Sequence, residues 1–176
     1  MPLDLVDLDP ETREQMLSEL ADDVASGRLY LSDRLSEAGR SEYPRLLTEA
    51  FADGDDSSLA RELSQPGMLV SFETATRRGH RYSKRVPYNA AETMAEGEFN
   101  RFYLRALCRS VLAFGGTELV IYRPRPSRSP RHISEQMIGQ RIDAESLLAD
   151  LRQHVGVDTA LGLPPGPNSG LSARHP

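Results

Sequence analysis

Apolar residues in the first third of the chain recur at the spacing of an amphipathic helix. The clearest case covers residues 9–27, where Asp9 precedes Pro10 as a candidate N-cap and Gly27 ends the pattern. Two further helices are predicted over residues 41–54 and 55–67, the second with Asp56 as its cap. The predicted apolar face of the first helix consists of Met16, Leu17, Leu20 and Val24.

The pattern then changes to the alternation that is typical of strands. Residues 68–76 and 81–88 are joined by Arg77-Arg78-Gly79-His80, which predicts a β-hairpin with Gly79 at a positive φ. Alternation within each strand places Val70 and Phe72 on one face, with Tyr82 and Val86 as partners, and turns Arg81 and Arg85 to the other. The hairpin is therefore expected to have one apolar and one basic face.

The longest predicted helix covers residues 89–116, with Asn89 and Glu92 as a capping box and Gly115-Gly116 as its end. Residues 118–122 are apolar on both faces, which favours an interior strand. An exposed proline-rich loop and a last helix capped by Asp143 follow. The stripe of the long helix consists of Met94, Phe99, Phe102, Tyr103, Ala106, Leu107, Val111 and Phe114.

These elements predict an α+β fold in which a small antiparallel sheet packs on one long central helix. The expected division is an acidic helical N-terminal lobe over residues 1–67, an α+β core with a basic hairpin and loop over residues 68–156, and an extended C-terminal arm over residues 157–176. Residues 161–176 are rich in proline and glycine, so an irregular tail with neither helix nor strand is expected. Its candidate anchors, on this chain or on a neighbour, are Leu161, Leu163 and Leu171.

The charge of the chain is unevenly distributed. Residues 1–64 contain 16 acidic and 6 basic side chains, whereas residues 65–132 contain 5 acidic and 12 basic ones, although the whole chain has a net charge of −5. Opposed blocks of this size favour an anionic partner at the middle of the chain or contact between copies.

Arg101, Arg105 and Arg109 recur every four residues and therefore lie on one ridge of the long helix. Like charges at this spacing repel, so the ridge requires anions from elsewhere. Three sources stay open: the acidic N-terminal helices of the same chain, a neighbouring copy, or the phosphates of a nucleic acid.

Two further basic sets lie outside the long helix. The arginine guanidinium group binds phosphate and carboxylate in a bidentate manner, so both sets are candidate anion- or partner-binding sites. Tyr82 and Tyr122 offer rings for stacking beside them. The hairpin set is Arg77, Arg78, Arg81, Lys84 and Arg85, with His80, and the loop set is Arg123, Arg125, Arg128 and Arg131.

None of the common enzyme motifs is present, and the four histidines have no metal-ligand spacing. Cys108 lies at a helical core position and predicts a buried structural thiol. Glu92 and Glu96 lie one helical turn apart and could together bind a divalent cation, so a metal-dependent nuclease activity stays an open alternative. We expect no catalytic residue, no metal and no cofactor.

The favoured interpretation is a non-enzymatic assembly protein that forms a homo-oligomer or part of a larger particle, such as a phage virion component. The alternative is a nucleic-acid-binding protein. The N-terminus has no export signal and no apolar run is long enough for a membrane span, so we expect a cytoplasmic or particle-associated protein whose partners are itself, another protein or a nucleic acid.

Overall fold

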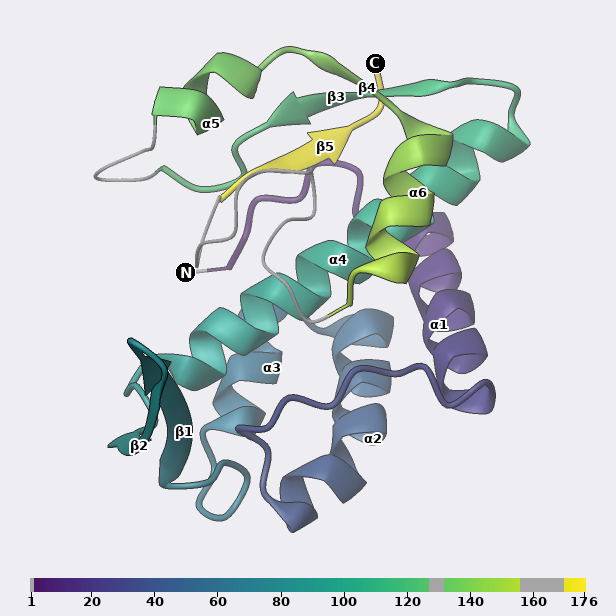
Figure 1. Cartoon of the computed structure of the whole chain (residues 1–176). Helices are drawn as coiled ribbons and strands as arrows, with labels where there is room; N and C mark the ends of the chain where they lie inside the picture. Colours follow the sequence, from purple (N-terminus) through teal and green to yellow (C-terminus); the bar gives the residue numbers. More distant parts are fainter. Residues whose placement is uncertain (1, 127–131, 156–169) are drawn as a thin grey trace.

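The chain folds around one long helix, α4 (Ala90–Ala113), which crosses the molecule with the other elements packed about it (Figure 1). The computed structural model describes residues 2–126, 132–155 and 170–176. The other helices are α1 (Pro10–Ala25), α2 (Glu37–Asp53), α3 (Asp56–Leu63), α5 (His132–Met137) and α6 (Ala144–Gln153). The strands are β1 (Phe72–Arg77), β2 (His80–Arg85), β3 (Glu118–Tyr122), β4 (Arg141–Asp143) and β5 (Ser172–Arg174). The predicted α+β class is confirmed, whereas α5 and β4 were not predicted.

Two helix starts follow from side chains that satisfy free backbone amides. The Asp9 carboxylate accepts a hydrogen bond from the amide of Thr12 at 2.8 Å, and Pro10 occupies the first turn of α1. The Asp143 carboxylate accepts from the amide of Ser146 at 2.8 Å at the start of α6. Both predicted N-caps are confirmed.

Two other predicted caps are wrong. Helix α3 is capped by Asp55, whose carboxylate accepts from the amide of Ser58 at 2.7 Å while the Ser58 hydroxyl accepts from the amide of Asp55 at 2.9 Å. Asp56 is instead buried, with its carboxylate 2.8 Å from the amide of Leu3. Asn89 makes no side-chain cap on α4, because its backbone (φ −96°, ψ 17°) is not extended.

The core is a single cluster of buried apolar side chains that draws on α1, α2, α3, α4, α6, β3 and β5. Residues 101–108 of α4 are buried on every side of the helix, because α1, α3, α6 and the sheet surround it. Phe51 of α2 packs against Phe99 and Phe102 of α4, with ring centroids 5.4 and 5.0 Å apart. Phe114, predicted to continue the apolar stripe, is 77% exposed beyond the end of α4.

Strand β3 lies between β4 and β5 in an antiparallel sheet that covers one side of α4 (Figure 1). Its predicted interior position is confirmed: Leu119 pairs with Ile142 of β4 and Ile121 with Ala173 of β5. The prediction that the whole segment 161–176 is irregular is wrong at its end. Ser172–Arg174 forms β5 by pairing with β3, which is possible because its residues include no proline and keep the backbone donors that a ladder requires.

Cys108 is fully buried in α4, as predicted, and burial raises the pKa of its thiol to about 12. Since the thiolate is the reactive form, we expect no reaction of the native protein with a thiol-specific disulfide reagent at mildly alkaline pH, and full reaction after unfolding in urea. Absorbance of the released thiolate measures both rates. Rapid labelling of the folded protein would contradict the burial of Cys108.

Candidate nucleic-acid interface

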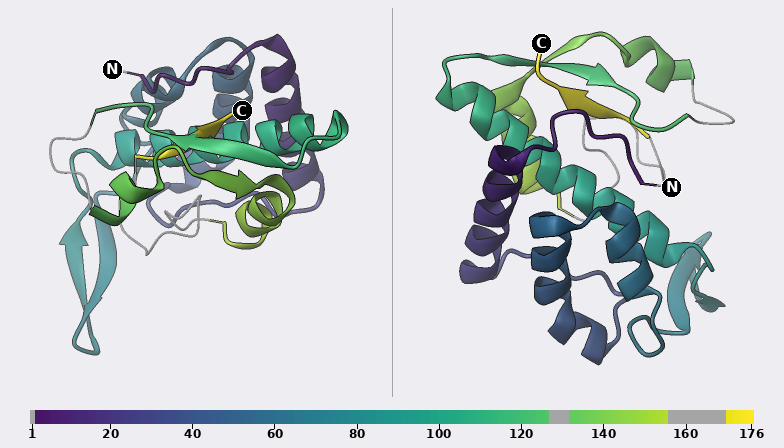
Figure 2. Two further views of the ribbon diagram at one scale, coloured as in Figure 1. Left: turned by 90° about the horizontal axis from the view of Figure 1, so that it is seen from above. Right: turned by 180° about the vertical axis from the view of Figure 1, so that it is seen from behind.

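Strands β1 and β2 form an antiparallel two-stranded ribbon that projects away from the helices (Figure 2, left). The strands are joined by Arg78 and Gly79, whose φ values of 51° and 81° are those of a type I′ hairpin turn. The predicted hairpin and the positive φ of Gly79 are confirmed. We refer to residues 72–85 as the basic ribbon.

The predicted faces of the ribbon are wrong. Phe72 pairs with Arg85, and Tyr82 pairs with Ala75. Because directly paired residues share a face, Phe72 and Tyr82 lie on opposite faces. The two-residue turn sets this register, whereas the prediction rested on alternation within each strand. The ribbon therefore has no apolar face, and basic side chains lie on both.

The side chains of the ribbon are almost uniformly hydrogen-bond donors. Between Thr74 and Arg85, every side chain except those of Ala75 and Gly79 carries a donor, and none carries a carboxylate. All residues of β2 are exposed. No hydrogen bond or ion pair joins the side chains of three arginines to any other described residue: Arg77, Arg78 and Arg81.

The base of the ribbon is fixed to the body by Glu73. Its carboxylate accepts from Arg34 Nε at 2.6 Å and lies 3.1 Å from Lys84 Nζ, and the hydrogen bond from Arg34 lowers the pKa of Glu73. The Arg85 guanidinium lies 5.7 Å from the centre of the Phe72 ring. Lys84 and Arg85 therefore have partners at the base, whereas the tip is left to solvent.

The α4 ridge, in contrast, is paired inside the chain. Arg105 is 2% exposed: its Nε donates to Glu19 at 2.6 Å, and its two Nη atoms donate to the Asp23 carboxylate at 2.6 and 3.0 Å. Arg109 donates to Glu19 at 3.1 Å. The sequence left three sources of anions open, and the structure shows that acidic residues of α1 in the same chain pair with Arg105 and Arg109. Arg105 is thus closed to phosphate and to a partner protein.

Arg101 is also closed to solvent. Its side chain is 6% exposed, and its Nη1 donates to the carbonyl oxygens of Leu151 and His154 near the end of α6, at 3.4 and 3.0 Å. Its Nε lies 3.5 Å from Glu98, whose pKa is raised by burial. The ridge thus joins α4 to α1 and α6 within the chain.

We refer to Arg105, Glu19 and Asp23 as the buried cluster. The contribution of Glu19 to the stability of the protein depends on pH. Burial opposes its ionisation, but hydrogen bonds from Arg152 and Arg105 outweigh burial and hold its pKa below the ordinary value of 4.5. A carboxyl group with a lowered folded pKa stabilises the protein above its unfolded pKa, and this contribution is lost as the pH falls through the folded value.

We therefore expect Glu19→Gln to lower the free energy of unfolding most at neutral pH, with the deficit shrinking as the pH falls below 4.5. Urea unfolding of both proteins at neutral and acidic pH measures the difference. Other carboxyl groups, such as Glu98, titrate in both proteins and cancel in the comparison. A deficit that grows on acidification would contradict the assignment.

The proline-rich loop is not a basic surface over the residues described. Arg125 forms an ion pair with Glu96 of α4 at 2.6 Å, and Arg123 is half-buried. The other two arginines of this predicted set, Arg128 and Arg131, lie outside the described residues.

The end of the C-terminal arm packs on its own chain. Leu171 is 1% exposed, and its carbonyl oxygen accepts from Asn100 Nδ2 at 2.9 Å. The Ser172 hydroxyl donates to Asn100 Oδ1 at 2.6 Å. The predicted anchor Leu171 therefore acts in cis. The other two predicted anchors, Leu161 and Leu163, lie outside the described residues.

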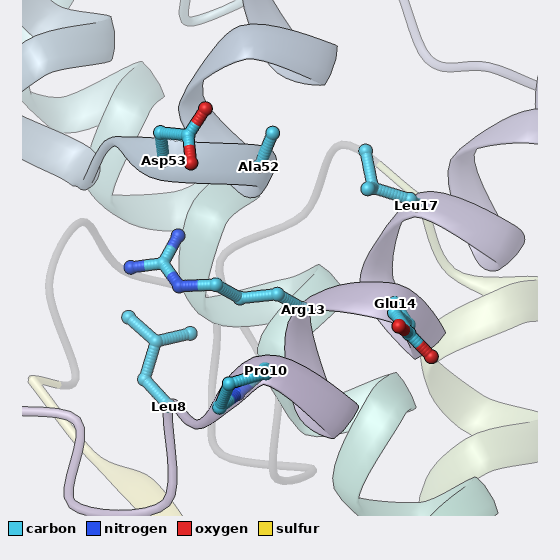
Figure 3. Close-up of a pocket in the computed structure, with 7 residues that line it drawn as sticks. All are labelled: Leu8, Pro10, Arg13, Glu14, Leu17, Ala52 and Asp53. Atoms are coloured by element: carbon cyan, nitrogen blue, oxygen red, sulfur yellow. The ribbon is translucent and has the colours of Figure 1, made fainter.

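A shallow hollow of about 460 Å³ lies between α1 and the end of α2 (Figure 3). Leu8 and Leu17 form apolar parts of its lining, and Glu14 and Asp53 add carboxylates. Arg13 crosses it and donates to the carbonyl oxygens of Phe51 and Gly54 at 2.9 and 3.0 Å, which ties α1 to the end of α2.

Other features of the described residues add no second site. Within residues 2–126, 132–155 and 170–176, no three His, Cys, Asp or Glu side chains are grouped so as to hold a metal ion, and Glu96 is held by Arg125. No helix in this part of the chain combines the length and the apolar character that crossing a membrane requires. We compared the chain with protein-family models, with curated proteins and with solved structures, and none of the three comparisons found a match.

One candidate contact residue was missed from the sequence and one was misplaced. Tyr88, just after the ribbon, is fully exposed, and its position after Pro87 and before the start of α4 was the only signal for it. Tyr122, considered as a stacking residue, instead donates its hydroxyl to the carbonyl of Asp4 at 2.9 Å. The candidate surface consists of the basic ribbon and Tyr88.

Proposed function

We propose that this protein binds nucleic acid through the basic ribbon. The observation that supports this proposal is the run of exposed donors from Thr74 to Arg85, which lacks any carboxylate and includes three arginines without an ion pair among the described residues. Phosphate oxygens accept hydrogen bonds and repel carboxylates, so a run of side chains that is rich in donors and lacks carboxylates suits a phosphate backbone.

The shape of the ribbon supports the same proposal. A projecting two-stranded ribbon can enter a groove or follow a strand, while the body of the protein, whose chain carries a net charge of −5, stays clear of the phosphates. An isolated two-stranded ribbon is only marginally stable, so contact with a polyanion would also help to order it.

The test is fluorescence anisotropy with labelled oligonucleotides at increasing salt. Contacts to about four phosphates give a slope of about −3 for the logarithm of the association constant against the logarithm of the salt concentration, and a loss of roughly 50-fold between about 50 and about 200 mM salt. Absence of binding at low salt, or binding that salt does not weaken, would contradict the proposal.

Self-association is the second candidate, and the acidic surface of α1 and α2 favours it. Glu14 and Asp53 beside the hollow form no ion pair with another described residue, and they could receive arginines of the ribbon from a second copy. The pairing of Arg105 and Arg109 within the chain removes the ridge from this interpretation, but not the ribbon.

Size-exclusion chromatography with light scattering tests self-association. If a second copy binds at the hollow, the wild-type protein elutes as an oligomer, and reversing the charges with Glu14→Lys and Asp53→Lys returns it to a monomer. A monomer across the accessible concentration range would leave nucleic-acid binding as the remaining candidate.

A further inference from the structure

Two tyrosine rings at the ribbon are open to solvent. Tyr82 is 46% exposed, and its cross-strand partner Ala75 is too small to cover the ring. Tyr88 is fully exposed. Neither tyrosine has an aromatic or cationic group over its ring among the described residues, unlike Phe72, which lies beneath Arg85.

Groups that can bind phosphate flank the ring of Tyr82. His80 and Lys84 lie two residues away on either side along the same strand, and therefore on the same face, at a spacing of about 6.5–7 Å. Lys84 is paired there with Glu73 at the base of the ribbon, whereas His80 lies toward the tip. Arg77 pairs with His80 across the ribbon and lies on that face as well. Toward the tip, this face places a stacking surface beside groups suited to phosphate, which is the arrangement that tracks an extended nucleic-acid strand.

Open rings of this kind distinguish unpaired from paired nucleic acid. In a duplex, each base is covered above and below by its neighbours, so a tyrosine ring can stack on a base only after the base pairs are separated. An unpaired strand presents its base faces without that cost, and stacking on tyrosine tolerates any base sequence. We infer that the ligand of the basic ribbon is single-stranded nucleic acid, with Tyr82 and Tyr88 stacking on its bases.

This inference rests on the proposed function, and the same assay separates the two. Three fluorescein-labelled probes of about 20 nucleotides are compared at one salt concentration: oligothymidylate, oligouridylate and a DNA duplex of equal length. We expect at least one of the two single strands to bind about 10-fold more tightly than the duplex. The ratio of oligouridylate to oligothymidylate affinity then assigns the ligand to RNA or to DNA.

Tyr82 variants test the stacking itself. We expect Tyr82→Ala to weaken binding of the preferred single strand by about 10-fold while leaving the salt slope unchanged, because the lost contact is uncharged. Tyr82→Phe retains the ring and should bind within about twofold of wild type. Arg77→Ser, in contrast, removes a cation from the face of Tyr82 and should make the slope shallower by about 0.7.

Phe114→Ala is the matched control, since Phe114 is an exposed ring at the opposite end of α4. It should leave binding unchanged, and circular dichroism should show the same helix content in all variants. Equal or tighter binding of the duplex, or an unchanged affinity in Tyr82→Ala, overturns the single-strand inference and leaves the proposed function in place. Failure of all three probes to bind overturns both.

Discussion

Replacing Arg105 with methionine is expected to lower the free energy of unfolding by about 3–5 kcal/mol. Arg105 is the partner of two carboxylates of α1, and the side chains of Glu19 and Asp23 are only 1% and 7% exposed. Glu19 would retain Arg109 and Arg152, but the Asp23 carboxylate would lose its only ion pair among the described residues. A buried charge without a partner is among the most destabilising changes a core can undergo.

Urea denaturation followed by circular dichroism measures this loss. Arg45→Met is the matched control: Arg45 also contacts two carboxylates, Glu42 and Glu49, but on the exposed surface of α2, so little change is expected. Adding Asp23→Asn to Arg105→Met should restore part of the lost stability, since it removes the stranded charge. A loss for Arg105→Met no larger than that for Arg45→Met would contradict the buried cluster.

Replacing Arg77, Arg78, Arg81 and Arg85 with serine is expected to weaken nucleic-acid binding by at least about 100-fold at low salt. All four side chains are exposed, and three have no ion pair with another described residue, so the fold does not depend on their charge. The unfolding transition should therefore stay close to that of the wild type while binding is lost.

The experiment must separate the effect of the lower net charge from the effect of removing arginines at the ribbon. A second variant removes four exposed arginines elsewhere on the surface, Arg28, Arg45, Arg61 and Arg141, and so has the same net charge as the ribbon variant. It should bind within a few-fold of the wild type, because distant charges are screened beyond about 10 Å. Equal losses in the two variants would point to overall charge and argue against a site at the ribbon.

Local signals in the sequence were sufficient for most of the helices. Asp9 and Asp143 cap the helices they were predicted to cap, because the bond from an N-cap to an amide three residues later depends only on nearby residues. The cap of α3 was misplaced by one residue, although a local signal favours Asp55. Ser58, three residues after Asp55, completes a reciprocal pair of hydrogen bonds with it, whereas the residue three positions after Asp56 is a leucine, which has no polar side chain.

The sequence limited the possible partners of the α4 arginines but could not identify which of them are present. Their spacing implied repulsion and therefore a need for carboxylates. That Glu19 and Asp23 supply them depends on how α1 packs against α4, which is a tertiary contact between residues more than 80 positions apart. Periodicity describes each helix separately and carries no information on which helices meet.

The ribbon and the C-terminal strand show two different reasons for error. The register of the ribbon follows from its two-residue turn at Arg78-Gly79, so the pairing of Phe72 with Arg85 can be deduced from the sequence once the turn is placed at these two residues. Strand β5 was not available in this way, because three residues carry little strand signal alone and depend on the neighbouring β3.

The salt dependence of binding by the ribbon variant tests the proposed function most directly. We expect a slope of about −3 for the wild-type protein with its preferred oligonucleotide, and a slope near zero for the protein with serine at positions 77, 78, 81 and 85. A slope that is unchanged in this variant would show that the phosphates are bound elsewhere on the protein, and would contradict the assignment of the basic ribbon as the nucleic-acid interface.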